Sequence, residues 1–329
     1  MSQKVVFISS KIPEAGLALL KQDGYQVIEW DSERRINKEE LIAHCKDAHA
    51  LLNARSTQLD EEFFKACSHL EIVSLLSAGY DHVDLAAANN YRVPVTNTPG
   101  VLSKATADTA FLLMMAASRK AFFQHKKIIN GKWQKNLPTD LLGIELRGKT
   151  LGIFGLGQIG LEMGRMCKRA LDMEIIYHNR TRNEAAEEVL DATWVSFDEL
   201  LDRSDVISVH SALTADTKGR FNKDVFYRMK SNAIFINTSR GAVHNEMDLI
   251  SVLEEKRIWG AGLDVTNPEP MSPDNPLLFM ENVAVLPHIG SATVETRNEM
   301  SLLAAKNIIA RFNDEILLTC LNPEVLEVT

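Results

Sequence analysis

A glycine-rich turn between an apolar strand and a helix is the feature that most constrains how this chain can fold. Gly155, Gly157 and Gly160 follow the apolar run 149–154, and a helical pattern begins at Gln158 and Ile159. With 17 glycines in 329 residues, this spacing arises by chance about 0.04 times per chain. The first glycine permits a tight turn, the second lets backbone approach a pyrophosphate, and the third lets helix and strand pack closely. The motif therefore predicts a dinucleotide-binding unit, with the phosphates at the N-terminus of the helix.

Short apolar runs alternate with helical patterns along the whole chain, which predicts parallel sheets covered by helices. The predicted strands are 5–9, 25–30, 50–53, 72–76 and 94–97, then 150–154, 174–178, 206–210, 233–237, 260–263 and 283–286. Predicted helices include 13–21, 38–45, 60–66, 84–89, one long helix over 105–130, and a last helix over 294–312. We expect an α/β protein, with a Rossmann-type doubly wound parallel sheet inserted into a smaller flavodoxin-like domain.

The position of the glycine motif sets the domain order. A complete α/β unit precedes it, so the dinucleotide domain cannot come first in the chain. We expect a dinucleotide-binding domain at 101–290. It is inserted into a substrate (catalytic) domain made of 1–100 and 291–329.

Composition excludes several classes of partner. The formal net charge is −8, so the surface has no general attraction for nucleic acid or for anionic membranes. The chain has 4 cysteines without CxxC or zinc-type spacing, which favours a reducing, cytoplasmic environment and no metal site. The first residues form a strand-like run and do not resemble a signal peptide.

The segment after the strand 174–178 indicates which dinucleotide is bound. An NAD site normally places Asp or Glu there to bind the ribose 2′-hydroxyl. This chain instead has Asn179, Arg180, Thr181 and Arg182, whose donors and positive charge suit a 2′-phosphate. The prediction is a preference for NADP(H), with NAD(H) as the alternative cofactor; a solvated basic loop is the competing interpretation.

Three later segments carry reactive side chains directly after strands of the second series. Arg240 follows 233–237, Glu269 follows 260–263, and His288 follows 283–286. Because ligands of an open α/β sheet lie beyond the carboxyl ends of its strands, these residues are expected to converge near the nicotinamide. Arg240 can bind a carboxylate and a carbonyl oxygen, while His288, oriented by Glu269, can protonate a forming alkoxide.

These segments closely resemble the D-isomer-specific 2-hydroxyacid dehydrogenases, and within them the glyoxylate/hydroxypyruvate reductases. The resemblance covers 76–81, 97–100, the glycine motif, 236–241, 262–270 and 286–293. It implies that Arg240, Glu269 and His288 are the catalytic residues and that the enzyme is a homodimer paired through its nucleotide domain. It also implies substrate contacts from Ala78, Gly79 and Ser291, with Arg240 and His288, and nicotinamide contacts from Thr106, Ala212, Thr238 and Asp264.

The implied reaction is the NADPH-dependent reduction of hydroxypyruvate to D-glycerate and of glyoxylate to glycolate. Alternatives are a reductase of 2-ketogluconate or another 2-keto acid, and a non-enzymatic dinucleotide-sensing scaffold. One departure concerns a tryptophan that some reductases of this branch place in the partner subunit's pocket. Asp140 aligns with that position and Trp133 with a different one, so substrate size preference stays open.

Overall fold

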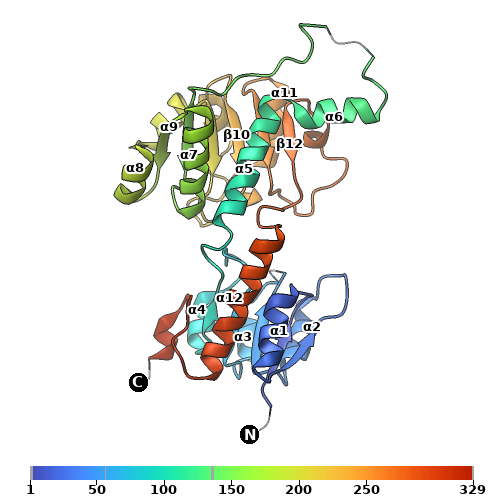
Figure 1. The fold of residues 1–329 in the computed structure, drawn as a ribbon, viewed down its shortest axis with the longest axis vertical. Helices are drawn as coiled ribbons and strands as arrows, with labels where there is room; N and C mark the ends of the chain where they lie inside the picture. The colour runs from blue at the N-terminus through green and yellow to red at the C-terminus, as the bar shows by residue number, and fades with distance from the viewer. Residues whose placement is uncertain (1–2, 56, 135–136, 328–329) are drawn as a thin grey trace. The chain divides into compact units, whose positions relative to one another are not determined.

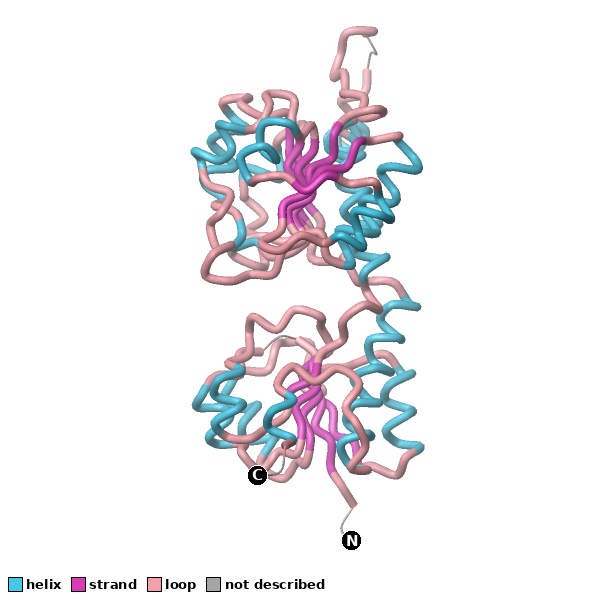
Figure 2. The backbone as a smooth tube through the Cα atoms, turned by 90° about the vertical axis from the view of Figure 1, so that its left-hand side faces the viewer, coloured by secondary structure: helices cyan, strands magenta, loops and turns pink. Residues whose placement is uncertain are grey.

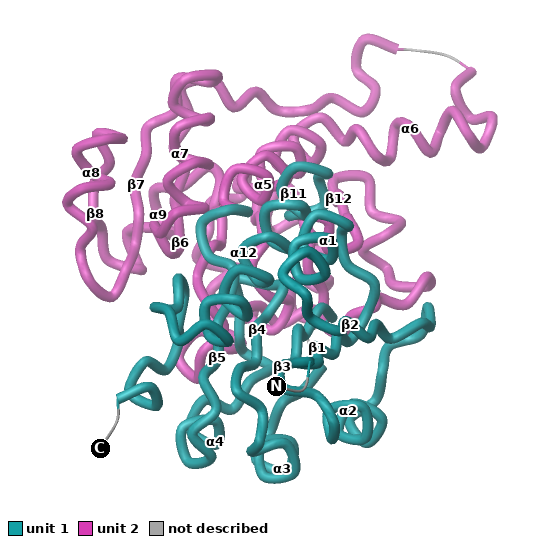
Figure 3. Tube along the Cα trace, turned by 60° about the horizontal axis from the view of Figure 1, so that its bottom comes forward, with its two compact units in different colours: residues 1–102, 291–329 teal, residues 103–290 magenta. Residues whose placement is uncertain are grey.

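The structure, a computed structural model, describes residues 3–55, 57–134 and 137–327 and divides into two compact units. Unit 1 comprises Met1–Leu102 and Ser291–Thr329, and unit 2 comprises Ser103–Gly290 (Figure 3). The first boundary thus falls after residue 102, against 100 in the sequence-based expectation. Within each unit the strands lie between helices on two sides (Figure 2).

Unit 1 contains a five-stranded parallel sheet in the order β2-β1-β3-β4-β5, which is the flavodoxin-like order. Its strands are β1 (Val5–Ile8), β2 (Gln26–Glu29), β3 (Ala50–Asn53), β4 (Ile72–Leu75) and β5 (Val95–Thr96). Its α-helices are α1 (Glu14–Gln22), α2 (Lys38–Cys45), α3 (Glu61–Ala66), α4 (Leu85–Asn90) and α12 (Val294–Phe312).

Helix α12 returns to this unit although the chain has passed through unit 2 before reaching it (Figure 1). It packs beside α1, where a Cβ on Gly16 would lie 2.5 Å from the carbonyl oxygen of Ser301. The buried hydroxyl of Ser74 on β4 donates to the carbonyl of Ala304, at 3.1 Å. These contacts require close packing of α12 on the unit, so the last helix belongs to the first domain's core.

Unit 2 contains a seven-stranded parallel sheet in the order β12-β11-β10-β9-β6-β7-β8. Its strands are β6 (Thr150–Phe154), β7 (Glu174–His178), β8 (Thr193–Trp194), β9 (Val206–Val209), β10 (Ile234–Asn237), β11 (Gly260–Leu263) and β12 (Val283–Val285). Its α-helices are α5 (Ser103–Ser118), α6 (Ala121–Ile129), α7 (Gln158–Leu171), α8 (Glu184–Leu190), α9 (Phe197–Arg203), α10 (Lys223–Arg228) and α11 (Glu246–Glu254). This is the doubly wound Rossmann order, and the order reverses between β6 and β9.

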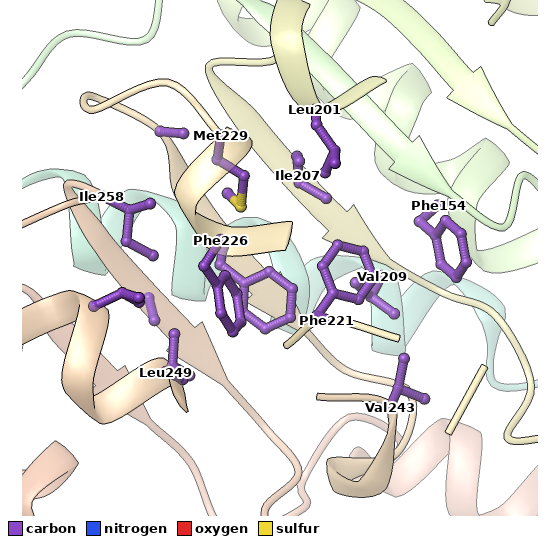
Figure 4. Packing of buried hydrophobic residues seen from close by; sticks show 14 of the residues in the cluster. Phe154, Leu201, Ile207, Val209, Phe221, Phe226, Met229, Val243, Leu249 and Ile258 are labelled. Carbon is purple, nitrogen blue, oxygen red and sulfur yellow. The ribbon is translucent and has the colours of Figure 1, made fainter. Parts of the chain in front are cut away.

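Alternation along the strands of unit 2 builds a separate core on each face of the sheet. Ile153 packs with residues of α5 and α7, whereas its neighbour Phe154 packs with α9, α10 and the loops between them. Figure 4 shows this second cluster, in which Phe226 lies between Leu249 and Phe221 in the view. The sheet is therefore buried on both sides, as a parallel sheet requires.

Two features differ from the sequence-based expectation. The helix expected over 105–130 is two helices, because Lys120 adopts a left-handed conformation with φ 53° between α5 and α6. The two-residue strand β8 was not predicted. In the described parts of the chain, no helix is both long and apolar enough to cross a membrane.

Candidate active site

The glycine turn lies where the strand order of unit 2 reverses. Gly155 has φ +98°, and a Cβ there would lie 2.7 Å from the backbone nitrogen of Ser211, which follows β9. A Cβ on Gly160 would lie 2.9 Å from the carbonyl oxygen of Gly155. Gly157 precedes α7 and has open space where a Cβ would point. The turn is thus closed on its protein side and open at the N-terminus of α7, which suits a pyrophosphate.

Of the four residues after β7, two have side chains that form hydrogen bonds within the protein and two have side chains that are exposed. The side-chain amide of Asn179 accepts from the N–H of Leu156 at 2.7 Å and donates to its carbonyl at 3.2 Å. Arg182 forms a bidentate pair with Glu187, at 2.7 Å from Nη2 and 2.8 Å from Nε. Arg180 and Thr181 are exposed, and neither side chain has a hydrogen-bond partner among the described residues.

A tyrosine completes the Arg182 arrangement. The hydroxyl of Tyr177 donates to Glu187 at 2.5 Å and accepts from the backbone N–H of Asn183 at 2.8 Å. Hydrogen bonds from Arg182 and Tyr177 lower the pKa of Glu187 to about 2. Glu187 therefore stays ionised and neutralises Arg182, which leaves Arg180 as the uncompensated cation of this loop.

Arg240 lies in a turn that the buried side chain of Asn237 organises from the end of β10. The Asn237 amide donates to the carbonyl of Arg240 at 2.9 Å and accepts from the N–H of Ser239 at 3.0 Å. The guanidinium of Arg240 donates to the carbonyl of Ser239 at 2.8 Å. Asn237 therefore sets the backbone from which the guanidinium projects.

Glu269 and His288 are in direct contact. The Nδ1 of His288 lies 2.5 Å from Oε1 of Glu269, and the two side chains are 47% and 42% exposed. The carboxylate holds the proton on Nδ1, so Nε2 is the nitrogen that can exchange a proton with a ligand. The pair has the geometry of a general acid–base oriented by a carboxylate.

Asp264 fixes the backbone around His288. Its two carboxylate oxygens accept from the N–H groups of Ile289 and Gly290, both at 2.8 Å, and its carbonyl accepts from the N–H of His288, also at 2.8 Å. Burial raises the pKa of the Asp264 carboxyl. Asp264, which is expected to contact the nicotinamide, thus uses both side-chain oxygens in hydrogen bonds to the backbone that follows His288.

Comparison with known proteins identifies the family. The model of the D-isomer specific 2-hydroxyacid dehydrogenase NAD binding domain matches residues 111–290. The chain belongs to the D-isomer-specific 2-hydroxyacid dehydrogenases. The resemblance inferred from its motifs and the predicted fold class are both confirmed, and the family makes it an oxidoreductase that uses a nicotinamide dinucleotide.

Relatives within this dehydrogenase family match over almost the full chain. A glyoxylate reductase from Korarchaeum cryptofilum is 40% identical over 324 residues, which is 98% of this chain and 97% of that one. A probable 2-ketogluconate reductase from Dictyostelium discoideum is 35% identical, with 98% and 97% of the two chains covered. The crystal structure of an NADPH-dependent glyoxylate/hydroxypyruvate reductase from Sinorhizobium meliloti, in complex with NADP and malonate, has a TM-score of 0.85 at 32% identity, covering 97% of both chains.

The other nicotinamide positions implied by the dehydrogenase family also lie in unit 2. Thr106 is buried in the first turn of α5, and the carbonyl of Ala212 accepts from the hydroxyl of Thr217 at 2.7 Å. The hydroxyl of Thr238 lies 3.4 Å from Nδ1 of His210. Contact of these residues with the cofactor stays a prediction.

The implied substrate loop of the dehydrogenase belongs to unit 1 and follows β4. The side-chain amide of Asn97 donates to the carbonyl of Ala78, and the hydroxyl of Ser77 donates to the carbonyl of Gly79, both at 2.7 Å. The N–H groups of Ala78 and Gly79 have no partner among the described residues. Two unpaired amides beside each other suit a carboxylate.

The substrate contact expected of Ser291 stays a prediction, and the effect of Asp140 on substrate size stays open. Ser291 is the first residue after the chain re-enters unit 1, and its carbonyl accepts from the N–H of Thr293 at 3.0 Å. Asp140 is exposed in the segment after α6. No cluster of three potential metal ligands occurs among the residues that the structure describes.

Proposed function

We propose that the enzyme reduces small 2-keto acids, converting hydroxypyruvate to D-glycerate and glyoxylate to glycolate, with NADPH preferred over NADH. The observation that carries this proposal is the His288–Glu269 pair at 2.5 Å, in the same unit as the glycine turn and Arg240. An acid–base histidine and an arginine are the groups that reduction of a 2-oxo acid requires. The relatives named as glyoxylate and 2-ketogluconate reductases support the same substrate class.

In the proposed reaction, bound reduced nicotinamide supplies a hydride to C2 of the keto acid. The guanidinium of Arg240 holds the substrate carboxylate and polarises the carbonyl oxygen at C2. His288 donates its Nε2 proton to that oxygen as the alkoxide forms, and Glu269 stabilises the protonated imidazole beforehand. The amides of Ala78 and Gly79 bind the carboxylate, and Ser291 supplies a further polar contact.

The experiment that tests this function compares initial rates on hydroxypyruvate, glyoxylate, 2-ketogluconate and pyruvate with each cofactor. The expected order has hydroxypyruvate and glyoxylate first. His288→Ala should abolish most turnover and leave cofactor binding intact. Tight cofactor binding without turnover on any 2-keto acid would instead favour the dinucleotide-sensing scaffold.

The preference for NADPH rests on Arg180 and Thr181. A 2′-phosphate needs positive charge and donors that are not already occupied, and Arg182 is neutralised by Glu187. Arg180→Ala should raise the KM for NADPH about tenfold, which corresponds to roughly 1.4 kcal/mol, and leave the KM for NADH unchanged. Wild-type turnover with NADH that equals or exceeds turnover with NADPH would overturn the preference.

Helix α6 and the segment after it support the proposed homodimer. No residue of α6 is buried, and its large apolar side chains include Ile128 and Ile129, 55% and 69% exposed. Trp133 and Leu142 beyond the helix are each 60% exposed. A second copy of the chain, paired through unit 2, would cover these side chains. We expect a dimer by sedimentation and weakened association in Ile129→Lys.

The 4 cysteines are all free thiols, which supports a cytoplasmic location.

A further inference from the structure

A buried carboxylate outside the proposed catalytic set lies at the start of α11. Glu246 is 9% exposed and is the first residue of that helix. Its Oε1 accepts from the side-chain amide of Asn275 at 2.7 Å, and its Oε2 accepts from the backbone N–H of Asn267 at 3.1 Å. Among the described residues, no lysine or arginine forms an ion pair with it. A buried carboxylate needs hydrogen-bond donors such as these two N–H groups of Asn275 and Asn267, and the position of Glu246 at a helix N-terminus also favours its negative charge.

The two donors are the two ends of the segment that carries Glu269. Asn267 lies two residues before Glu269, and Asn275 lies six residues after it. Between them the segment forms neither helix nor strand. Asn275 also begins the short 3-10 helix 276–279, because its side-chain oxygen accepts from the N–H of Leu277 at 3.0 Å. One side chain of α11 therefore holds both ends of the loop.

The same helix is joined to the turn that carries Arg240. Gly241 lies so close to the Glu269 segment that a Cβ there would be 2.0 Å from the carbonyl oxygen of Thr266. The chain passes from Gly241 through one 3-10 turn into α11. The Arg240 turn, α11 and the Glu269 loop consequently pack as one block, and Glu246 is the polar group that links the last two.

We propose that Glu246 is a positioning residue that holds Glu269 against Nδ1 of His288. The His288–Glu269 pair is about half exposed, so burial does not align it, and its geometry depends on the loop. The carboxylates that act on His288 are Glu269, in direct contact, and Asp264, which holds the following backbone. A loosened loop weakens the first of these and leaves the second in place. The protonated imidazole then loses its main support.

The test compares Glu246→Gln with Glu254→Gln. Glutamine keeps an acceptor for the N–H of Asn267 but turns an NH₂ group toward the NH₂ group of Asn275, so one of the two bonds is lost. Glu254 lies on the same helix, is exposed and has no side-chain partner among the described residues, so its replacement matches the change in charge alone.

For Glu246→Gln we expect kcat for 2-keto acid reduction to fall roughly 10- to 100-fold, with the KM for the dinucleotide unchanged. The alkaline limb of the rate profile should move to lower pH. In the ligand-free enzyme, the imidazole NMR titration of His288 should move in the same direction. That titration is assigned by comparison with His288→Asn. Glu254→Gln should match the wild type in every measurement.

A double-mutant cycle separates positioning from general destabilisation. Because Glu246 acts through Glu269, its replacement should add nothing to the kcat loss of Glu269→Ala. Additive losses, or a His288 titration that does not move, would overturn the proposal. If Glu246→Gln does not fold, Asn275→Ala removes one of the same bonds and should shift the titration less, in the same direction; an unchanged titration there overturns it too.

The kinetic part rests on the proposed function, whereas the NMR titration needs no substrate. A chain that reduces none of the proposed keto acids but shows the titration shift retains the positioning role.

Discussion

His244 is a buried histidine that makes the stability of unit 2 depend on pH. It is 2% exposed, and burial lowers its pKa from 6.5 to about 4. Its Nδ1 lies 3.0 Å from the side-chain nitrogen of Asn237, which donates to it, and its Nε2 is buried with no hydrogen-bond partner among the described residues. Protonation at Nδ1 would replace this hydrogen bond with an opposed pair of donors, beside the turn that carries Arg240.

The sign and size of the effect follow from the two pKa values. Because the folded value is the lower one, the unfolded chain takes up the proton first as pH falls. The stabilising contribution is complete above 6.5 and is lost between 6.5 and about 4. At about pH 5 the loss from this residue is roughly 2 kcal/mol. His210 contributes in the same direction, since burial also lowers its pKa to about 4, but its side chain is only partly enclosed.

The assay is urea unfolding at about pH 7 and about pH 5, with wild type, His244→Leu and His125→Gln. His125 is exposed on α6 and is the matched control. The fall in unfolding free energy between the two pH values should be smaller in His244→Leu by roughly 2 kcal/mol, and unchanged in His125→Gln. An equal pH-dependent fall in wild type and His244→Leu would refute this account.

Three further changes give distinct outcomes. In Gly241→Ala, the Cβ at 2.0 Å from the Thr266 oxygen forces a shift of about 1 Å, and kcat should fall about 100-fold. The control Gly219→Ala, at a glycine with φ +62° and open space, should lose about 1 kcal/mol of stability at unchanged kcat. Equal kcat losses in the two variants would contradict the steric argument. Phe221→Ala should cost about 3–5 kcal/mol in urea unfolding, because this fully buried ring contacts four other aromatic rings; a loss below about 1 kcal/mol would show that the cluster closes around the cavity. Glu187→Gln should release Arg182 and lower the KM for NADPH several-fold without changing that for NADH, and equal changes with both cofactors would exclude an effect at the 2′-phosphate.

Periodicity and glycine placement predicted most of the fold because buried parallel strands and tight turns demand particular residues. The strands 50–53, 150–154, 174–178 and 260–263 have the predicted bounds. The break between α5 and α6 escaped prediction because Lys120, and not Gly or Pro, takes the left-handed conformation. Strand β8 has only two residues, too few for an alternating pattern to be visible.

The catalytic candidates could be predicted from the sequence because each follows a strand that ends at the same edge of the sheet. The hydrogen bonds that hold the surrounding backbone in place could not be predicted. The contact predicted between Asn179 and the phosphate stays a prediction, but the two hydrogen bonds between its side-chain amide and the backbone of Leu156 were not foreseen. Asn237 received no role, although it organises the Arg240 turn. Glu246 was missed because an acidic residue at a helix start is common on electrostatic grounds alone. The contacts of Asn179 and Glu246 depend on partners more than about 20 residues away in the chain, namely Leu156 for the first and Asn267 and Asn275 for the second.

The arrangement of Arg240, Glu269 and His288 within one unit has a consequence for how such enzymes diversify. The groups proposed to polarise the carbonyl and to transfer the proton are encoded within a single stretch, 240–288, which folds inside unit 2. The Ala78–Gly79 loop proposed for the carboxylate is encoded far upstream, in unit 1. Mutation can therefore alter the recognition loop without altering the stretch that carries the chemistry.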